Sequence, residues 1–467
     1  MRSPLLAVLT VAVCGAISPS VEGQSPTDAM VRPEPRVTFD GPTLTFDWPA
    51  VHVGVAEYDE GPTGATVIFF PGRVTAAVDV RGGAPGTIET DALRLGYDAA
   101  FVDAISFAGG SAYGLAAATG AAAELKDRRG DPTRWDSIAV VPGAIIFDLG
   151  DRRFGAVTPD EALGRAALRA ARPGIFPLGG RGAGRFAMQG SYFGTRAHSG
   201  QGAAFRQTGR TKVAVFTVVN ARGTVVDRDG RVVRCGNDPE VTDCGTIGER
   251  FRSVYESFDR PEGSAGSGSA GSVSAGGLTA NTTITLVVTN QPLDFWALQR
   301  MATHVHSSMA RAIQPFHTEN DGDALFAVTT GELDDPDLTP EALYTLAADV
   351  AWDAVLASVP ALPTWERRIV DVDPDRLAGL AGEYDFGTGA RLSVRLEGTI
   401  LVAEAIGSKR VYGFALGEPV ELRPTSPVDF LATGSGTDRL QFEIDEGSAT
   451  GLVLNPGPWG LPATRAR

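Results

Sequence analysis

The sequence predicts an α/β body followed by a small antiparallel β domain. In the body, buried strands over residues 65–70, 76–80 and 213–219 alternate with helices, including an Ala-rich helix over 113–126. From residue 370 onward, short strands separated by Gly-rich turns follow one another at regular spacing. That spacing is typical of an antiparallel sandwich or barrel.

The composition is that of a globular protein and narrows the classes of function. Of 467 residues, 43% are hydrophobic and 21% are charged, which excludes a disordered or collagen-like chain. The formal net charge is −15, and no stretch dense in Lys and Arg offsets it. A nucleic-acid-binding protein needs such a stretch to displace counterions, so we do not expect nucleic acid as a partner.

The amino terminus predicts export. Arg2 precedes an apolar run over residues 5–16, and small residues surround a cut after Gly23, so residues 1–23 read as a signal peptide. The run is shorter than the about 20 apolar residues that span a bilayer, and we expect no membrane span. The protein is therefore expected to be periplasmic or secreted. A lipoprotein attached through Cys14 is the alternative, and the bulky residue before that cysteine disfavours it.

Two cysteines remain after removal of the signal peptide. Cys235 and Cys244 lie nine positions apart and, in an oxidising compartment, are expected to close a small loop as a disulfide. A metal site is the alternative, but two thiolates rarely suffice and no histidine lies nearby in the sequence. The five histidines are scattered along the chain. We expect no metal and no other cofactor.

A Gly/Ser-rich segment interrupts the body. Residues 261–277 are nearly all Gly, Ser and Ala, the composition of a flexible linker. The strand over 282–289 and the helix over 293–313 that follow it lack an obvious core of their own. We therefore expect the segment to interrupt one folded unit over 37–366, with the β-rich domain at 370–467.

The end of this segment is a candidate site of self-cleavage. The chain passes through Asn281 into Thr282, a hydroxyl residue that opens a buried strand. In self-cleaving N-terminal-nucleophile enzymes such a hydroxyl attacks the preceding carbonyl, and hydrolysis of the ester frees an α-amine on the nucleophile. That amine has a reference pKa of about 8 and can act as the base. Taken alone, the pattern fits an ordinary strand start better.

Glycine-rich turns and a pair of acids are further candidates. Residues 108–114 form a strand-to-helix turn that contains Ser111, but a nucleophile elbow needs glycine where Tyr113 stands, so close helix packing is the better interpretation. Asp321 and Asp323 lack the spacing of an EF-hand. They could orient an amine or belong to a plain turn.

Six motifs in one order resemble a known family. They lie between residues 59 and 332 and read VDVRGGAPGTIETDAL, VDAISFAGGSAYGLAAATG, VVPGAIIFDLGD, VVNARGTVVD, NTTITLVVT and ARAIQPFHTENDGDALFAVTTGE. The family is that of the L-aminopeptidase/D-esterases, which includes β-peptidyl aminopeptidases and a pantetheine hydrolase. The resemblance implies an α/β fold, a four-layer αββα sandwich of the N-terminal-nucleophile type, which cuts itself into two chains and assembles into homo-oligomers.

The resemblance also implies roles for five residues. It makes Asn281–Thr282 the scissile bond and Thr282 the nucleophile. Asn220, in VVNARG, would help form the oxyanion hole. Asp321 and Asp323 would orient the amine and hydroxyl of Thr282.

Two departures from the family's pattern bear on the substrate. Ile-Phe-Asp-Leu at 146–149 stands where some members have a catalytic Tyr, and Arg-Gly-Ala-Gly-Arg-Phe at 181–186 replaces a Gly-Ala-Gly-Thr-Gly run. Arg185 would narrow or recharge the substrate pocket. We expect the pocket also to include Gly109, Gly110 and Ser111.

The tail, on residues 377–405 and 427–447, is similar to a lipocalin-like domain and is expected to form a small accessory β-barrel. The sequence thus predicts an exported, self-processing aminopeptidase that acts on a short peptide or amide through an acyl-enzyme on Thr282. Two alternatives stay open: a self-cleaving acyl or aminoacyl transferase, and a non-catalytic exported binding protein.

Overall fold

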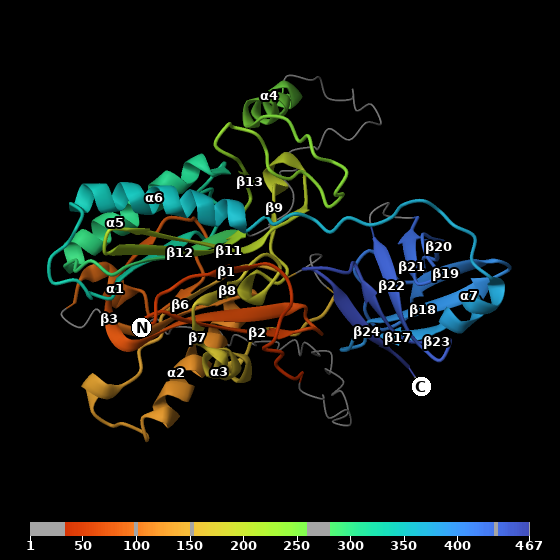
Figure 1. Cartoon of the computed structure of the whole chain (residues 1–467), viewed down its shortest axis with the longest axis horizontal. Coiled ribbons are helices and arrows are strands. Elements are labelled where there is room, and N and C mark those ends of the chain that lie inside the picture. The colour runs from red at the N-terminus through yellow and green to blue at the C-terminus, as the bar shows by residue number, and fades with distance from the viewer. Residues whose placement is uncertain (1–32, 98–100, 150–153, 259–280, 434–437, 467) are drawn as a thin grey trace, which may run out of the picture. The chain divides into compact units, whose positions relative to one another are not determined.

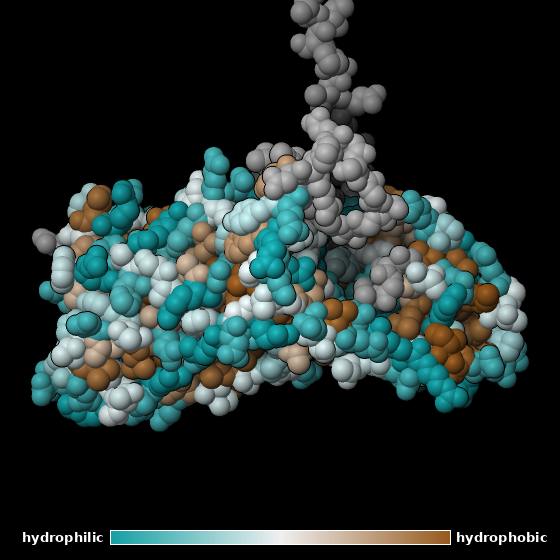
Figure 2. Space-filling model, turned by 90° about the horizontal axis from the view of Figure 1, so that it is seen from above, coloured by the Kyte–Doolittle hydropathy of each residue, from teal (hydrophilic) through white to brown (hydrophobic). Residues whose placement is uncertain are grey.

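The computed structural model describes residues 33–97, 101–149, 154–258, 281–433 and 438–466 (Figure 1). The predicted signal peptide and the Gly/Ser-rich segment lie outside the described residues. No helix in the described ranges is long and apolar enough to cross a membrane. On the face drawn in Figure 2, hydrophobic side chains occur in separate patches among hydrophilic ones.

A mixed sheet of ten strands forms the centre of the body. Its main path runs through β11 (Gly200–Thr208), β12 (Thr211–Asn220), β14 (Thr282–Thr289), β16 (Ala324–Thr329), β3 (Thr63–Val80), β5 (Phe101–Ala108), β6 (Gly143–Ile145) and β4 (Thr87–Ile88). Beside it, β2 (His52–Tyr58) pairs with β3 and with β7 (Arg172–Pro173). Strands from both sides of residues 259–280 therefore lie in one sheet.

The 18-residue strand β3 joins two halves of this sheet. Its register with β5 shifts between Phe69 and Val74. Before the shift β3 pairs with β2, and after it β3 pairs with β16. The sequence predicted two separate strands here. Pro71, which has no N–H to donate, is exposed within the shift, so one bulged strand replaces the expected pair.

The two halves of the sheet stack on each other. Apolar residues of β2 and β5 share one buried cluster with alternate residues of β12 and β14, such as Phe216 and Leu286. The neighbouring residues Val215 and Val287 point the other way and pack with α5 (Phe295–Ser308) and α6 (Pro340–Ala357). Both faces of these strands are thus apolar, as expected for strands buried on both sides.

Helices α2 (Ala116–Arg128) and α3 (Glu161–Ala170) cover the outer face of the β2–β5 half. The order of layers is helices, sheet, sheet, helices (Figure 1), so the predicted αββα sandwich is confirmed. Gly54 and Gly202 allow the outer helices to approach closely. A Cβ on Gly54 would lie 1.8 Å from the Ala167 oxygen of α3, and a Cβ on Gly202 would lie 2.0 Å from the Ala354 oxygen of α6.

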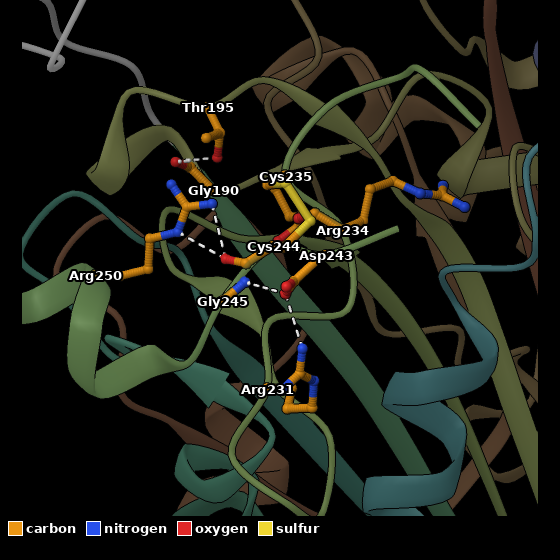
Figure 3. Close-up of a disulfide and its surroundings, with 10 residues drawn as sticks. Gly190, Thr195, Arg231, Arg234, Cys235, Asp243, Cys244, Gly245 and Arg250 are labelled. Atoms are coloured by element: carbon orange, nitrogen blue, oxygen red, sulfur yellow. Dashed lines mark hydrogen bonds and ion pairs between the residues drawn. A yellow bond between two sulfur atoms is a disulfide. The ribbon is translucent and has the colours of Figure 1, made fainter. Parts of the chain in front are cut away.

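The described part of the body also contains two further α-helices and three pairs of short strands. They are α1 (Asp91–Leu95), α4 (Ile247–Phe258) and the strand pairs β1 (Thr43–Thr45) with β8 (Ile175–Pro177), β9 (Met188–Gln189) with β10 (Ala197–His198), and β13 (Thr224–Val225) with β15 (Ile313–Gln314). Cys235 and Cys244 are joined by a disulfide, as Figure 3 shows. Arg250 of α4 donates to the Cys244 oxygen at 2.9 Å, and Arg231 pairs with Asp243 at 2.8 Å, so the disulfide loop is fixed on both sides.

The tail forms a closed antiparallel barrel, and the prediction of a small β-barrel is confirmed. Helix α7 (Pro374–Leu380) precedes eight strands: β17 (Gly382–Asp385), β18 (Arg391–Glu397), β19 (Ile400–Ala405), β20 (Val420–Pro424), β21 (Asp429–Ala432), β22 (Arg439–Asp445), β23 (Ser448–Leu454) and β24 (Leu461–Arg465). Alternate residues, for example Leu401 and Ala403, are buried inside it. Pairing of β17 with β24 closes the barrel and leaves no free edge.

Candidate active site

The bond between Asn281 and Thr282 lies where three strands of the central sheet begin or end. In the antiparallel pair of β12 and β14, Asn220 stands directly opposite Thr282. On the other side Asn281 forms a bridge with Asp321, just before β16. The fold therefore brings together residues that are far apart in the sequence. All of them are buried, and Thr282 is only 3% exposed.

The hydroxyl and the carbonyl at this bond are in contact. The Thr282 Oγ1 donates a hydrogen bond to the Asn281 oxygen. The same oxygen accepts the backbone N–H of Gly322 at 2.8 Å. A backbone N–H in this position polarises the carbonyl and stabilises negative charge that forms on its oxygen. A Cβ on Gly322 would lie 2.7 Å from Thr282 Oγ1, so the approach needs a residue without a side chain.

Asp323 fixes the start of β14. Its Oδ1 accepts the backbone N–H of Thr283 at 2.7 Å. Its Oδ2 accepts the backbone N–H of His317 at 3.0 Å and lies 3.0 Å from His317 Nδ1. The carboxylate is fully buried and is satisfied on both oxygens. It therefore holds the residue next to the candidate nucleophile.

Asp321 is the second acid of the pair. Its oxygens accept the Thr318 hydroxyl at 2.6 Å and the backbone N–H of Arg222 at 3.2 Å. Burial raises the pKa of the Asp321 carboxyl to about 6, and the charge of Asp323 raises it further in the same direction. The side chain thus holds a proton at mildly acidic pH, where an ordinary aspartate would have lost it.

The raised pKa predicts how Asp321 affects stability. Between its ordinary pKa of 3.8 and about 6, the folded chain holds a proton that the unfolded chain has released, so this group's contribution to stability falls as pH rises. In an uncut Thr282→Ala background, Asp321→Asn removes that cost. The free energy of unfolding of this double variant, measured relative to that of the Thr282→Ala chain, should rise by about 1–3 kcal/mol from pH 4 to pH 7. Urea unfolding at both pH values measures it, and an unchanged effect would contradict the assignment.

Asn220 is held by two segments of the body. Its Nδ2 donates to the Phe147 oxygen at 3.0 Å, and its Oδ1 accepts the Met188 N–H at 3.1 Å. The amide is buried, opposite Thr282. Its orientation is therefore set by its neighbours before any substrate binds.

The glycine-rich turn over residues 108–114 contacts the segment that orients Asn220. The Gly110 N–H donates to Asp148 Oδ1 at 2.7 Å, and the Ser111 N–H donates to the Ile146 oxygen at 3.0 Å. Gly109 packs so closely that a Cβ would lie 2.4 Å from Asp148 Oδ2. The turn thus supports the segment whose Phe147 carbonyl orients Asn220.

Arg185 lies elsewhere. Its side chain is 1% exposed and pairs with Glu57 at 3.1 Å and Asp59 at 3.5 Å. It also donates to the Gly460 oxygen at 2.5 Å. The structure thus brings five of the predicted residues together and places Arg185 where the barrel meets the body. Its charge is directed at the buried Glu57 and the partly exposed Asp59.

The loop over residues 80–90 packs against the acidic pair. The Arg81 N–H donates to the Asp323 oxygen at 3.0 Å, and the Ala84 N–H donates to the Asp321 oxygen at 2.8 Å. A Cβ on Gly82 would lie 2.3 Å from that Asp321 oxygen. This rigid loop keeps both acids at the end of β16.

Sequence reasoning missed two histidines. His317 contacts Asp323 directly, and its ring centroid lies 4.3 Å from that of His306. His306 Nδ1 in turn lies 2.9 Å from Asp79 Oδ2. The one signal available was the position of His317 in the same motif as the two acids. His306 comes from a helix and could not be placed from sequence.

A narrow hollow adjoins the acyl side of the bond. Asn281 Nδ2 donates to Ser191 Oγ at 3.2 Å. The hollow is lined by Met188, Gln189, Ser191, Thr195, Arg196, Ala221 and Asn281. Asn281 thus contributes to this lining.

The αββα sandwich, with a buried hydroxyl residue at the start of a central strand, is the arrangement of the N-terminal-nucleophile fold. Residues 44–367 match the model of peptidase family S58. The chain belongs to peptidase family S58 and is a hydrolase of amide bonds, so it is an enzyme and not a non-catalytic binding protein. The family match ends before α7 and the barrel.

Relatives of this chain include two kinds of enzyme. It is 44% identical over 324 residues to the 6-aminohexanoate-oligomer endohydrolase of Paenarthrobacter ureafaciens, covering 67% of this chain and 85% of that protein. It is 37% identical over 309 residues to an uncharacterized aminopeptidase of Mycobacterium tuberculosis, covering 63% and 85%. A β-aminopeptidase structure from a Burkholderia species covers 69% of this chain and 89% of its own, at 18% identity and a TM-score of 0.48.

Proposed function

We propose that this protein is an exported hydrolase that cuts itself between Asn281 and Thr282 and then removes the N-terminal residue from short peptides, amides or esters. The observation that carries the proposal is the contact of the Thr282 hydroxyl with the Asn281 carbonyl, whose oxygen also accepts the Gly322 N–H at 2.8 Å. Nucleophile and oxyanion donor thus stand at the same carbonyl. The processed chains are proposed to assemble as homo-oligomers.

We propose that self-cleavage proceeds in three steps, which this geometry supports. The Thr282 oxygen attacks the Asn281 carbonyl carbon, and the Gly322 N–H stabilises the negative charge on the carbonyl oxygen. The carbon–nitrogen bond then breaks, and the nitrogen takes up the proton that the hydroxyl loses. Water hydrolyses the resulting ester. The products are a carboxylate on Asn281 and a free amine beside the Thr282 hydroxyl.

The same groups then act on a substrate. The Thr282 amine takes the hydroxyl proton as the oxygen attacks the substrate carbonyl, and the proton passes to the departing amine. Gly322 and Asn220 stabilise the oxyanion, a kind of interaction worth about 3–4 kcal/mol per donor in comparable sites. Asp323 and Asp321 orient the nucleophilic residue. Water then hydrolyses the acyl-enzyme.

Hydrolysis without an acceptor tests the proposal. The purified protein is incubated with aminoacyl p-nitroanilides and with short 6-aminohexanoate oligomers, the substrate named for one relative. We expect product at a rate independent of added amine. Product that forms only with an added amine would indicate the transferase instead. N-terminal sequencing of the protein from its native host tests export, with a first residue after Gly23 as the expected result.

A further inference from the structure

The loop over residues 455–460 makes one of several contacts between the barrel and the body, beside those of Phe154 with Phe386 and of Phe186 with Tyr412. The Trp459 Nε1 donates to the Ser199 oxygen at 3.0 Å. The Trp459 ring stacks on His198, with centroids 4.9 Å apart and planes 16° apart. A Cβ on Gly180 would lie 2.5 Å from the Trp459 ring, so that glycine makes room for the indole. The side chains on both sides of this contact are thus held in place.

A cavity of about 290 Å³ lies beside this contact. We call it the barrel–body cavity; among its lining residues are Arg196, His198, Trp365, Tyr412, Arg439 and Trp459. Because the body supplies the first two and the barrel supplies the last three, the cavity requires both parts. The family match ends at residue 367, so the barrel walls lie outside the matched region.

The lining combines aromatic walls with positive charge. Arg196, Arg410 and Arg439 line the cavity, against one acid, Asp438, which accepts Asn455 Nδ2 at 2.8 Å. Two buried donors of the lining, Trp365 Nε1 and Arg439 Nε, have no hydrogen-bond partner in the described part of the chain. Unpaired donors and cations between aromatic rings favour an apolar group that ends in a carboxylate.

His198 does not add to the positive charge. Burial, and then the charge of Arg234, lower the pKa of its imidazole to about 3. The ring is therefore neutral at physiological pH. It acts as an apolar wall stacked on Trp459. The cationic character of the cavity comes from its arginines, of which Arg439 pairs with Asp429, an acid outside the lining.

Arg196 connects this cavity with the candidate active site. Its exposed side chain lines both the cavity and the narrow hollow beside Asn281. Among the described residues its guanidinium forms no ion pair, whereas many other arginines of the body are paired. A carboxylate that extends from the acyl side of the scissile bond would meet this free cation first.

We infer that the barrel–body cavity is the distal part of the substrate site and that it selects acyl groups whose side chain carries a carboxylate. This inference rests on the proposed function, because it takes the cleaved acyl group to replace Asn281. The proposed carboxylate partner is Arg196, which belongs to both linings, and the aromatic walls accept the methylene or aromatic part of the chain. The barrel thereby contributes to substrate choice and not only to stability.

Binding to the uncut Thr282→Ala chain tests the cavity separately from catalysis. The probe is 3-phenylpropionate, compared with its uncharged amide, and the signal is tryptophan fluorescence, since Trp365 and Trp459 line the cavity. We expect the acid to bind about 10-fold or more tightly than the amide. Arg196→Gln should remove this preference. The matched control Arg94→Gln, an exposed arginine of α1, should keep it.

Selectivity of the processed enzyme completes the test. Glutamyl and glutaminyl p-nitroanilides have the same shape and differ in charge. We expect kcat/KM to be about 10-fold higher for the glutamyl substrate. This preference should be smaller in Arg196→Gln and at high salt. The inference would be overturned if the acid and the amide bound equally or if the two arginine variants had equal effects. Turnover without a preference for the glutamyl substrate would also overturn it. Failure of self-cleavage and of all turnover, with the acid still bound, would instead overturn the proposed function.

Discussion

Replacing Thr282 with alanine is expected to leave the protein as one uncut chain and to lower amide hydrolysis by about 10⁴-fold or more. The wild type should separate into two chains on a denaturing gel, with the second beginning at Thr282. The reason is that the hydroxyl in contact with the Asn281 carbonyl is the attacking group, and alanine has none. Intact-mass spectrometry and turnover of an aminoacyl p-nitroanilide measure both effects.

The neighbouring threonine provides a matched control. Thr283 Oγ1 is buried and has no hydrogen-bond partner in the described residues. Thr283→Val has nearly the same shape and should still be cut. Thr282→Ser keeps a hydroxyl and should also be cut. An unbroken wild-type backbone at this position, or two chains from Thr282→Ala, would remove the basis of the mechanism.

Asp323→Asn is expected to slow both self-cleavage and turnover by about 10²-fold or more. The carboxylate accepts hydrogen bonds from Thr283 and His317 on its two oxygens. An amide can accept on only one side, so it turns an NH₂ group towards a donor and removes the negative charge beside the nucleophile. A time course of the two chains on a gel, together with kcat/KM, measures the loss.

A surface variant separates this effect from a general loss of stability. Asp334→Asn changes an exposed acid beyond the end of β16 and should process and turn over like the wild type. Near-UV circular dichroism of Asp323→Asn should remain native-like. A native fold with wild-type processing would show that the Asp323 charge is not needed.

The sequence predicted an α/β body from its buried strands and helices, whereas the four layers were implied by the resemblance to a family. Strands such as β12 and β14 have hydrophobic residues at consecutive positions, which favours burial on both sides. It could not predict that β3 is continuous, because Pro71 and Gly72 read as a break. A register shift against β5 accommodates them, and that depends on a partner strand.

The candidate nucleophile was visible only through a motif. Thr282 follows a linker, and the resemblance to a family singled it out from other strand starts. Contacts between distant segments could not be predicted. His306 lies 2.9 Å from Asp79 although more than two hundred positions separate them in the sequence. Arg185, in a turn, pairs with Glu57 of β2, whereas the sequence predicted that it would face the substrate.

The position of β14 in the sheet determines what becomes of the two pieces after the proposed cut. β14 and β16 would belong to the second piece, yet β12 and β3 of the first piece border them on either side. Neither fragment has a complete sheet without the other. The processed protein should therefore migrate as a single species on a native gel, and its halves should part only when the whole fold melts.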